Sequence, residues 1–226
     1  MKKLIAAIAI ITAVSVVYQA NAGILGQRYV GANVGYVSPG DSFIEEIDDS
    51  ILTYGVELRL PVSANLDIVA AGGQRLLEGD VPYSFSDYSD YSDYAYYYES
   101  GSIEVEVTST TVGGLLQYQF YPGAPINPFI GAGVMWSEYE IEVEGVSVDD
   151  DDTGVLVGGG LEFNLNDTMS LIGGLHYQTE MFEEDDVIAN AGFNIWIIPN
   201  LLLSVTGEYR FEAEDIGVAA GLGIAF

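Results

Sequence analysis

The last eleven residues of the chain alternate without exception between two kinds of side chain. One side holds Ile216, Val218, Ala220, Leu222, Ile224 and Phe226, and the other side holds only glycine and alanine. Successive side chains of a strand point to opposite faces, so the period of two predicts a strand with one apolar face and one face of tiny side chains against something crowded. Closing a sheet into a barrel removes the aggregation-prone edge that such a strand would expose. The segment therefore predicts the closing strand of a membrane barrel.

Residues 1–22 have the features of a secretory signal peptide. Lys2 and Lys3 precede an apolar run that ends at Val17, and Ala20 to Ala22 provides the small residues of a cleavage site. The run is shorter than the roughly 20 residues of a membrane-spanning helix. We expect cleavage after Ala22, which leaves residues 23–226 as one domain. The chain has no Cys, which excludes disulfides and thiolate metal sites.

Beyond residue 22 no apolar stretch is long enough for a transmembrane helix, although 49% of the chain is hydrophobic and 27 residues are glycine. Only closed barrels span membranes without helices. We predict an all-β, antiparallel, up-and-down transmembrane β-barrel of about ten strands. The alternating segments are 27–37, 51–61, 66–77, 102–121, 128–143, 153–165, 168–180, 187–198, 201–212 and 216–226.

The strand count leaves one alternative. Eight strands would span the membrane if one hairpin lay outside the bilayer. Within 102–121 the apolar residues change parity, because Val105 and Val107 are odd whereas Leu116 and Tyr118 are even. We expect a β-bulge between Thr108 and Gly114 to bring both sets to one face.

The expected connections alternate between short and long. Those near 63–65, 123–127, 166–167 and 199–200 are tight, and 38–50, 78–101, 144–152 and 181–186 are longer. Outer-membrane barrels keep short turns in the periplasm and long loops outside. We therefore expect both termini on the periplasmic side of the outer membrane of a Gram-negative bacterium.

Acidic residues dominate the charge of the chain, with 34 Asp and Glu against six Lys and Arg. Such a field repels nucleic acid and concentrates cations, so we expect no nucleic-acid partner. The runs Asp149 to Asp152 and Glu183 to Asp186 fit a solvated surface or a salt-adapted proteome, with Ca²⁺ or Mg²⁺ binding as the alternative. Neither run has the ligand spacing of an EF-hand loop.

One group of acidic residues is more clearly defined than the general acidity of the chain. Glu104 and Glu106 in one strand and Glu138, Glu140 and Glu142 in the next share a face of a hairpin, where like charges oppose pairing. We hypothesise that this ribbon projects above the bilayer and binds divalent cations that stabilise it. A fully hydrated ribbon is the alternative.

The long connection 78–101 repeats Ser-Asp-Tyr three times and then adds further tyrosines. Tyrosine combines a large contact area with a polar tip, so the segment is a candidate for adhesion to a surface, a glycan or a partner protein. A repeat expansion without function, or tyrosines in the headgroup layer, would also explain it. The tyrosines concerned are Tyr88, Tyr91, Tyr94, Tyr96, Tyr97 and Tyr98.

Parity also assigns the residues that face away from lipid. They include three Arg residues with acidic neighbours, which predicts an ion-pair plug; a narrow ion-conducting path is the alternative, since ten strands enclose more room than eight. The expected lumenal network is Glu57, Arg59, Asp67, Arg75, Glu162, Glu208 and Arg210, with His176, Gln178, Asn190 and Asn194 on the same face.

The sequence gives little support for a catalytic role. His176 is the only histidine, and no Ser at a suitable spacing completes a nucleophilic triad. We expect a lumenal hydrogen-bonding residue and no enzyme, with a rim-sited lipid or peptide hydrolase as a remote alternative. No cofactor motif is present, which leaves Ca²⁺ or Mg²⁺ at the outer loops as the possible bound ions.

The chain resembles the small outer-membrane β-barrel family of the OmpA membrane domain, OmpX-like and opacity-like proteins. The segments Asn127 to Val134, Gly207 to Phe211 and Gly221 to Phe226 carry the resemblance. It implies that Phe226 belongs to the signal read by the barrel-assembly machinery, and that the chain is a monomer among outer-membrane lipid and lipopolysaccharide. The strand number and the acidity of this chain differ from those of the family. A resemblance of this kind identifies a fold and a location but not an activity.

These observations favour a structural or surface-interaction role, as an adhesin or a cation-binding protein, with loops 38–50 and 78–101 making the contacts. A narrow, passive, cation-preferring pore is the second class of function.

Overall fold

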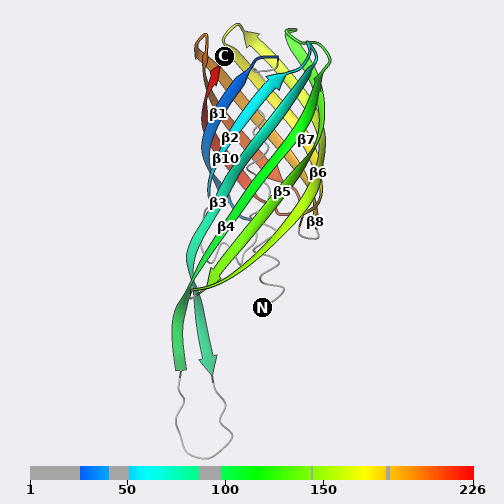
Figure 1. The fold of residues 1–226 in the computed structure, drawn as a ribbon. Coiled ribbons are helices and arrows are strands. Elements are labelled where there is room, and N and C mark those ends of the chain that lie inside the picture. The colour runs from blue at the N-terminus through cyan, green and yellow to red at the C-terminus, as the bar shows by residue number, and fades with distance from the viewer. Residues whose placement is uncertain (1–25, 41–50, 87–97, 144, 182–183) are drawn as a thin grey trace, which may run out of the picture.

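The structure is a computed structural model that describes residues 26–40, 51–86, 98–143, 145–181 and 184–226. Ten antiparallel strands form one closed barrel in which each strand pairs with its neighbours in the chain and β1 closes on β10. The predicted ten-stranded, all-β, up-and-down barrel is confirmed (Figure 1). The strands are β1 (Tyr29–Ser38), β2 (Ile51–Pro61), β3 (Leu66–Ser86), β4 (Tyr98–Gln119), β5 (Ile126–Val143), β6 (Val146–Asn166), β7 (Met169–Met181), β8 (Glu184–Ile198), β9 (Leu201–Arg210) and β10 (Ile216–Ala225).

The two ends of the barrel differ. The turn end holds Phe226, the start of β1 and the connections 62–65, 120–125, 167–168 and 199–200. The opposite end, called the hairpin end here, carries the long β3–β4 and β5–β6 hairpins. In Figure 1 the turn end is at the top, and β3 and β4 run on together below the rest of the barrel. Their pairing is continuous from Leu66 and Tyr118 to Ser86 and Tyr98.

Three expected outer loops are largely strand. In the expected loop 181–186, Met181 is the last residue of β7 and β8 begins at Glu184. Within 144–152, predicted as a loop, Gly145 is a turn residue with a positive φ of 79°, and residues 146–152 belong to β6. Residues 78–86 and 98–101 likewise belong to β3 and β4. The prediction was wrong because charged and low-complexity sequence was taken as a sign of loop, whereas polar residues suit strands whose sides both face water.

The bulge expected between Thr108 and Gly114 is absent. The register between β4 and β5 is unbroken from Val105 and Val143 to Gln119 and Phe129. Both apolar sets keep their parity because they lie on opposite faces: Val105 and Val107 are buried inside the barrel, whereas Leu116 is 54% exposed outside. Val105 and Val107 belong to an apolar cluster inside the hairpin end. Its members are Val37, Ile51, Leu77, Val105, Val107, Tyr139 and Ile141.

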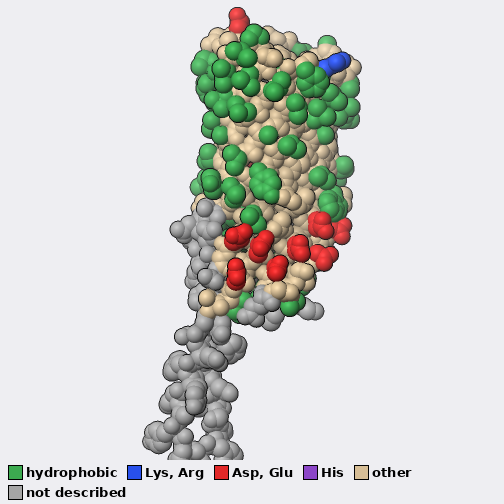
Figure 2. Space-filling model, turned by 60° about the vertical axis from the view of Figure 1, so that its left-hand side comes forward, with side chains coloured by type: hydrophobic (Ala, Val, Ile, Leu, Met, Phe, Trp, Pro, Cys, Tyr) green, Lys and Arg blue, Asp and Glu red, His purple; other side chains and the backbone are tan. Residues whose placement is uncertain are grey.

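The barrel is inside out compared with a water-soluble protein. Its outward side chains are apolar and exposed, as with Val34 and Leu222, whereas buried residues include the fully enclosed Arg59 and Arg75. Figure 2 shows apolar side chains over most of the barrel wall and acidic side chains gathered at the hairpin end. Among the described residues, no helix has the length and apolar character needed to cross a membrane. The surface is that of a barrel whose wall contacts lipid.

The inward face of β10 is crowded, as its tiny residues predict. A Cβ atom on Gly223 would lie 1.8 Å from Cε2 of Tyr29, and one on Gly31 would lie 2.0 Å from the Tyr29 hydroxyl oxygen. The two glycines thus make room for a buried tyrosine ring where β1 closes on β10.

Candidate functional sites in the lumen and at the hairpin end

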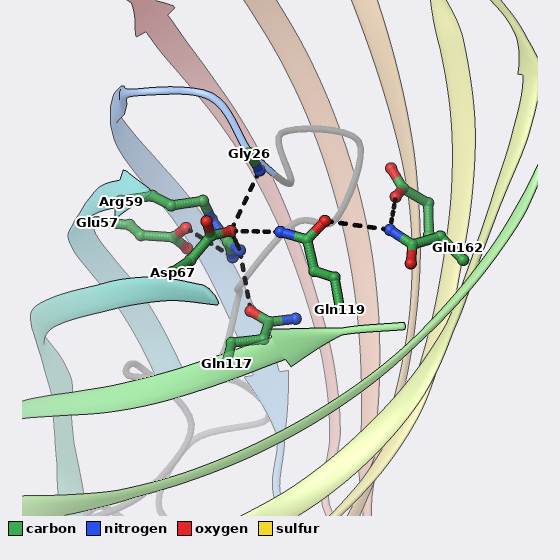
Figure 3. A network of polar contacts seen from close by, with 8 residues as sticks. Gly26, Glu57, Arg59, Asp67, Gln117, Gln119 and Glu162 are labelled. Carbon is green, nitrogen blue, oxygen red and sulfur yellow. Dashed lines mark hydrogen bonds and ion pairs between the residues drawn. The ribbon is translucent and has the colours of Figure 1, made fainter. Parts of the chain in front are cut away.

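A polar network fills the lumen near the turn end (Figure 3). At its centre, Arg59 of β2 lies 3.2 Å from the Asp67 carboxylate and 3.5 Å from the Glu57 carboxylate. Its Nη1 also donates to the Gln117 side-chain oxygen at 2.9 Å. We call this the turn-end network; it comprises Gly26, Glu57, Arg59, Asp67, Gln117, Gln119, Asn127 and Glu162.

The network crosses the lumen through side-chain amides. Gln119 donates to Asp67 Oδ2 at 2.9 Å, and Asn127 Nδ2 lies 3.3 Å from Gln119 Oε1 and 3.4 Å from Glu162 Oε2. The backbone N–H of Gly26, just before β1, donates to the same Asp67 oxygen at 3.2 Å. Five strands and the segment that leads into the barrel therefore meet on one carboxylate cluster.

A second ionic cluster, the hairpin-end network, lies toward the other mouth. Arg210 Nε donates to Asp186 Oδ2 at 2.6 Å, and its Nη1 lies 3.8 Å from Asp215 Oδ2. Arg75 Nη2 lies 3.6 Å from Glu208 Oε1. The members are Arg75, Asp186, Glu208, Arg210 and Asp215.

Asp215 ties this cluster to the start of the first outer connection. It lies in the turn between β9 and β10 and accepts the Gly40 N–H at 3.1 Å. A Cβ on Gly40 would lie 2.6 Å from the Ala213 carbonyl oxygen, so the turn packs closely on this glycine. Burial, as the largest influence, raises the pKa of the Asp215 carboxyl, opposed by the positive charges of Arg75 and Arg210.

All seven side chains of the predicted lumenal network lie inside the barrel, but in two groups rather than one. Glu57, Arg59, Asp67 and Glu162 belong to the turn-end network, and Arg75, Glu208 and Arg210 to the other. His176, Gln178 and Asn194 are buried inside as well. Two small spaces of about 10 Å³ each lie among the described residues, one next to Thr53 and one next to His176. Each is close to the least room that one water molecule needs.

The predicted acidic ribbon is broader than a single hairpin. Strand register places Glu106 beside Glu142, Glu140 beside Asp149, and Glu138 beside Asp151. All six are exposed on the outer face, and Figure 2 shows acidic side chains there below the apolar wall. We call Glu104, Glu106, Glu138, Glu140, Glu142, Asp149 and Asp151 the acidic sheet. Among the described residues, no three acidic or histidine side chains lie close enough together to hold one metal ion.

The β3–β4 hairpin has open edges beyond the barrel. Pairing of β2 with β3 stops at Leu76, and pairing of β5 with β4 stops at Val105. Among the described strands, residues 77–86 of β3 therefore pair only with β4, and residues 98–104 of β4 pair only with β3. Such edges present unpaired backbone N–H and C=O groups.

The predicted contact tyrosines and the predicted assembly residue Phe226 complete the set of candidate residues. Tyr88, Tyr91, Tyr94, Tyr96 and Tyr97 lie outside the described residues, and Tyr98 is the first residue of β4. Phe226 is 67% exposed at the turn end, and its N–H donates to the Arg28 carbonyl at 3.0 Å.

Sequence reasoning missed several members of the two networks. Gln117 and Gln119 alternate with Leu116, Tyr118 and Phe120, so their inward direction was readable from parity. Asp186 was taken as an outer-loop acid and Asp215 was not singled out, because no local pattern marks either as a partner of Arg210. Their burial depends on how β8, β9 and β10 converge.

The comparisons with known proteins point to one family. A family model described as outer membrane protein beta-barrel domain matches residues 6–196. No curated protein matches the chain in sequence. Similar solved structures include the translocator domain of the autotransporter NalP from Neisseria meningitidis, at 13% identity and a TM-score of 0.53, covering 92% of this chain and 90% of that one.

Two further solved structures are also similar. The outer membrane protein OprG from Pseudomonas aeruginosa is 14% identical, with a TM-score of 0.46 over 88% of this chain and 96% of that one. Neisserial surface protein A is 13% identical, with a TM-score of 0.43 over 88% and 97%. At these identities the comparisons concern the fold alone.

Proposed function

Because the chain belongs to the outer membrane protein beta-barrel domain family, we propose that it is a surface-interaction barrel of the Gram-negative outer membrane that binds partners at its hairpin end. In this proposal the turn end and both termini face the periplasm, and the barrel acts as a monomer. The observation that carries it is the β3–β4 hairpin, which projects beyond the barrel with both backbone edges open (Figure 1).

The packed lumen favours this role over a pore. Arg59, Asp67 and Arg75 have no solvent exposure, and both ionic networks lie across the lumen. An ion entering this path would have to displace side chains that bind one another. The hydrolase alternative is also disfavoured, since His176 is 3% exposed in the middle of β7 rather than at the rim.

The partner we propose is an extended, basic peptide segment that adds a strand to the open edge of β4. Main-chain hydrogen bonds provide affinity in such strand addition. The exposed Glu104 on this part of β4 favours a basic partner. The β3 edge is less suitable because it contains Pro82, which lacks the N–H that a new strand would use.

The register identifies an edge residue to test. Pro82 pairs with Ser102 and cannot donate to it, so this is a non-hydrogen-bonded pair and the Ser102 N–H points toward the open edge. We expect Ser102→Pro to abolish binding of a peptide of alternating lysine and valine, and Ser102→Ala to bind normally. A matched lysine peptide interrupted by prolines separates strand addition from charge attraction. Equal binding of the first peptide to both variants would refute the proposal.

The tyrosine repeat is proposed to widen this contact surface. Replacing residues 86–98 by a Gly-Ser linker of equal length should weaken adhesion of cells that display the barrel, because the aromatic contact area is lost. Heat-modifiable gel migration would verify that the barrel still folds. Unchanged adhesion to cells and to polymer surfaces would exclude a role for the repeat.

The acidic sheet supports a second element of the proposal, a cation-mediated contact with lipopolysaccharide. It lies on the outer face next to the apolar wall, and its cross-strand carboxylates repel one another. Ca²⁺ or Mg²⁺ would offset this repulsion and bridge the carboxylates to lipid phosphates. Since no compact chelating group is found among the described residues, we propose diffuse binding by several strands rather than one coordination site.

Calcium and a chelator test this contact. We expect calcium to raise and a chelator to lower the melting temperature in lipopolysaccharide-containing vesicles. The triple variant Glu138→Gln, Glu140→Gln and Glu142→Gln should lose this response. An unchanged melting temperature of the unmodified barrel under both treatments would exclude the cation role.

A further inference from the structure

An open groove of about 640 Å³ crosses the outer wall of the barrel between β3 and β8. Its middle is lined by Gly131, Ala132 and Gly158, which have short side chains or none. Larger apolar side chains, among them Leu116 and Leu175, border these small residues. The groove therefore lies where small residues interrupt the apolar wall.

Strand register explains the course of the groove. Its outward-facing lining residues belong to two neighbouring cross-strand rows, one with Leu66, Tyr118, Ile130 and Leu175 and the other with Leu116, Ala132, Val157, Tyr177 and Val187. At the usual spacing of about 4.8 Å between strands, the path from β3 to β8 is about 24 Å long. Strands of such barrels tilt by about 35–45°, so the path covers roughly 14–17 Å along the barrel axis. This is about half of the ~30 Å hydrocarbon core of a bilayer.

The β8 end of the groove lies at the edge of the apolar wall toward the hairpin end. There the Tyr177 hydroxyl donates to the carboxylate of Asp185, which is exposed. On β5, Trp136 Nε1 donates to Asp151 at 3.0 Å in the same manner. Tyrosine and tryptophan are enriched where the hydrocarbon core meets the headgroups. The groove therefore begins at the level of the lipid headgroups and descends from there toward the turn end.

The dimensions and polarity of the groove identify its occupant. Two residues of a strand are about 7 Å long, so a strip of this width and 24 Å length offers roughly 170 Å². A stable protein dimer needs about 800 Å² from each partner. The outward side chains that line the groove are uncharged, and their only polar atoms are the hydroxyls of Tyr118 and Tyr177. A single hydrocarbon chain therefore fits the groove, whereas a second protein surface does not.

We propose that the groove binds one acyl chain of lipopolysaccharide, with the lipid headgroup at the β8 end. This inference rests on the proposed function for its orientation, because an external hairpin end places the start of the groove in the outer leaflet, where lipopolysaccharide resides. The chain enters between Tyr177 and Val187 and passes Ala132 toward Leu66. The contact is apolar, so it needs no cation, unlike the contact proposed for the acidic sheet.

Ala132→Phe tests the site, because the added ring fills the middle of the groove on the outer face and leaves the lumen unchanged. The folded barrel would be mixed with short-chain lipopolysaccharide and phospholipid in mild detergent containing a chelator, and bound lipid would be identified by native mass spectrometry. We expect one lipopolysaccharide on the unmodified barrel and about tenfold weaker binding to Ala132→Phe, which corresponds to roughly two methylene groups left unburied.

Ala220→Phe is the matched control, since it makes the same change on the outward face of β10. It should bind lipopolysaccharide as the unmodified barrel does. Heat-modifiable gel migration would verify that each variant folds. If Ala132→Phe does not fold, Ala132→Leu and Ala220→Leu provide the same comparison with a smaller side chain.

The chelator separates this site from the cation-mediated contact. Weaker binding to the Ala132 variant than to the Ala220 variant supports the groove, even if calcium leaves the melting temperature unchanged. Equal binding to both variants would overturn the groove, whatever the effect of calcium. Preferential retention of phospholipid, or a barrel dimer that the Ala132 variant disrupts, would also overturn the proposal, because either result assigns the groove to another occupant.

Discussion

At the scale of single residues, the barrel interior depends on buried charges that pair with one another. Arg59 is fully enclosed and binds Asp67, Glu57 and Gln117 at once. Arg59→Ala should lower the free energy of unfolding by about 3–5 kcal/mol, because it leaves carboxylates buried without their cation. Denaturant titration in lipid vesicles measures this. Arg28→Ala at the exposed turn end serves as control and should change stability little; equal effects of the two changes would refute the structural role of Arg59.

A second residue-scale prediction concerns Gly223, which lies against the Tyr29 ring. Its missing side chain leaves the space that the Tyr29 ring occupies, with only 1.8 Å between a Cβ atom and Cε2. Gly223→Val should therefore prevent closure of β1 on β10, and heat-modifiable migration should be lost. Ala220→Val, on the outward face of the same strand, should migrate normally. If the Gly223 variant also migrates normally, the ring does not lie where the structure places it.

At the scale of elements, the turn between β9 and β10 links the lumen to the first outer connection through Asp215. Burial raises the pKa of its carboxyl, so folding favours the protonated acid. The resulting stability is present below the ordinary Asp pKa of about 3.9 and is lost as pH rises through the raised pKa. Asp215→Asn, which stays uncharged, should therefore gain stability relative to the unmodified protein as pH rises across this window. Glu214→Gln, at the exposed neighbour, is the control; parallel pH profiles for the Asp215 variant and the unmodified protein would contradict this interpretation.

The elements also show how far sequence reasoning reaches. Period-two alternation located all ten strands, because lipid on one side and a packed lumen on the other impose opposite side chains. It failed where that asymmetry ends: β3, β4 and β6 extend past the predicted limits into a region without lipid. The parity of Val105 and Leu116 was misread for a related reason, since inward residues become apolar at the hairpin end. The pairing of Arg210 with Asp186 and Asp215 required the three-dimensional arrangement, because no local pattern encodes it.

At the scale of the whole molecule, charge and apolar surface are separated along one axis. Apolar side chains cover the wall, and acidic side chains gather at the hairpin end, where β3 and β4 project (Figure 2). The lumen that joins the two ends is occupied by the two ionic networks. This arrangement supports a barrel that acts through its outer extension rather than by conduction.

Conductance across a planar bilayer is the most direct test of whether the lumen is closed. The same detergent-purified sample would first be shown by heat-modifiable migration to be a folded barrel. We expect no stepwise conductance, because buried side chains close the lumen. Relaxing the plug in Arg59→Ala, if that variant folds, should make conductance appear and would show that the assay detects an open lumen. Discrete, cation-selective steps from the unmodified protein would contradict the closed lumen and make the chain a pore.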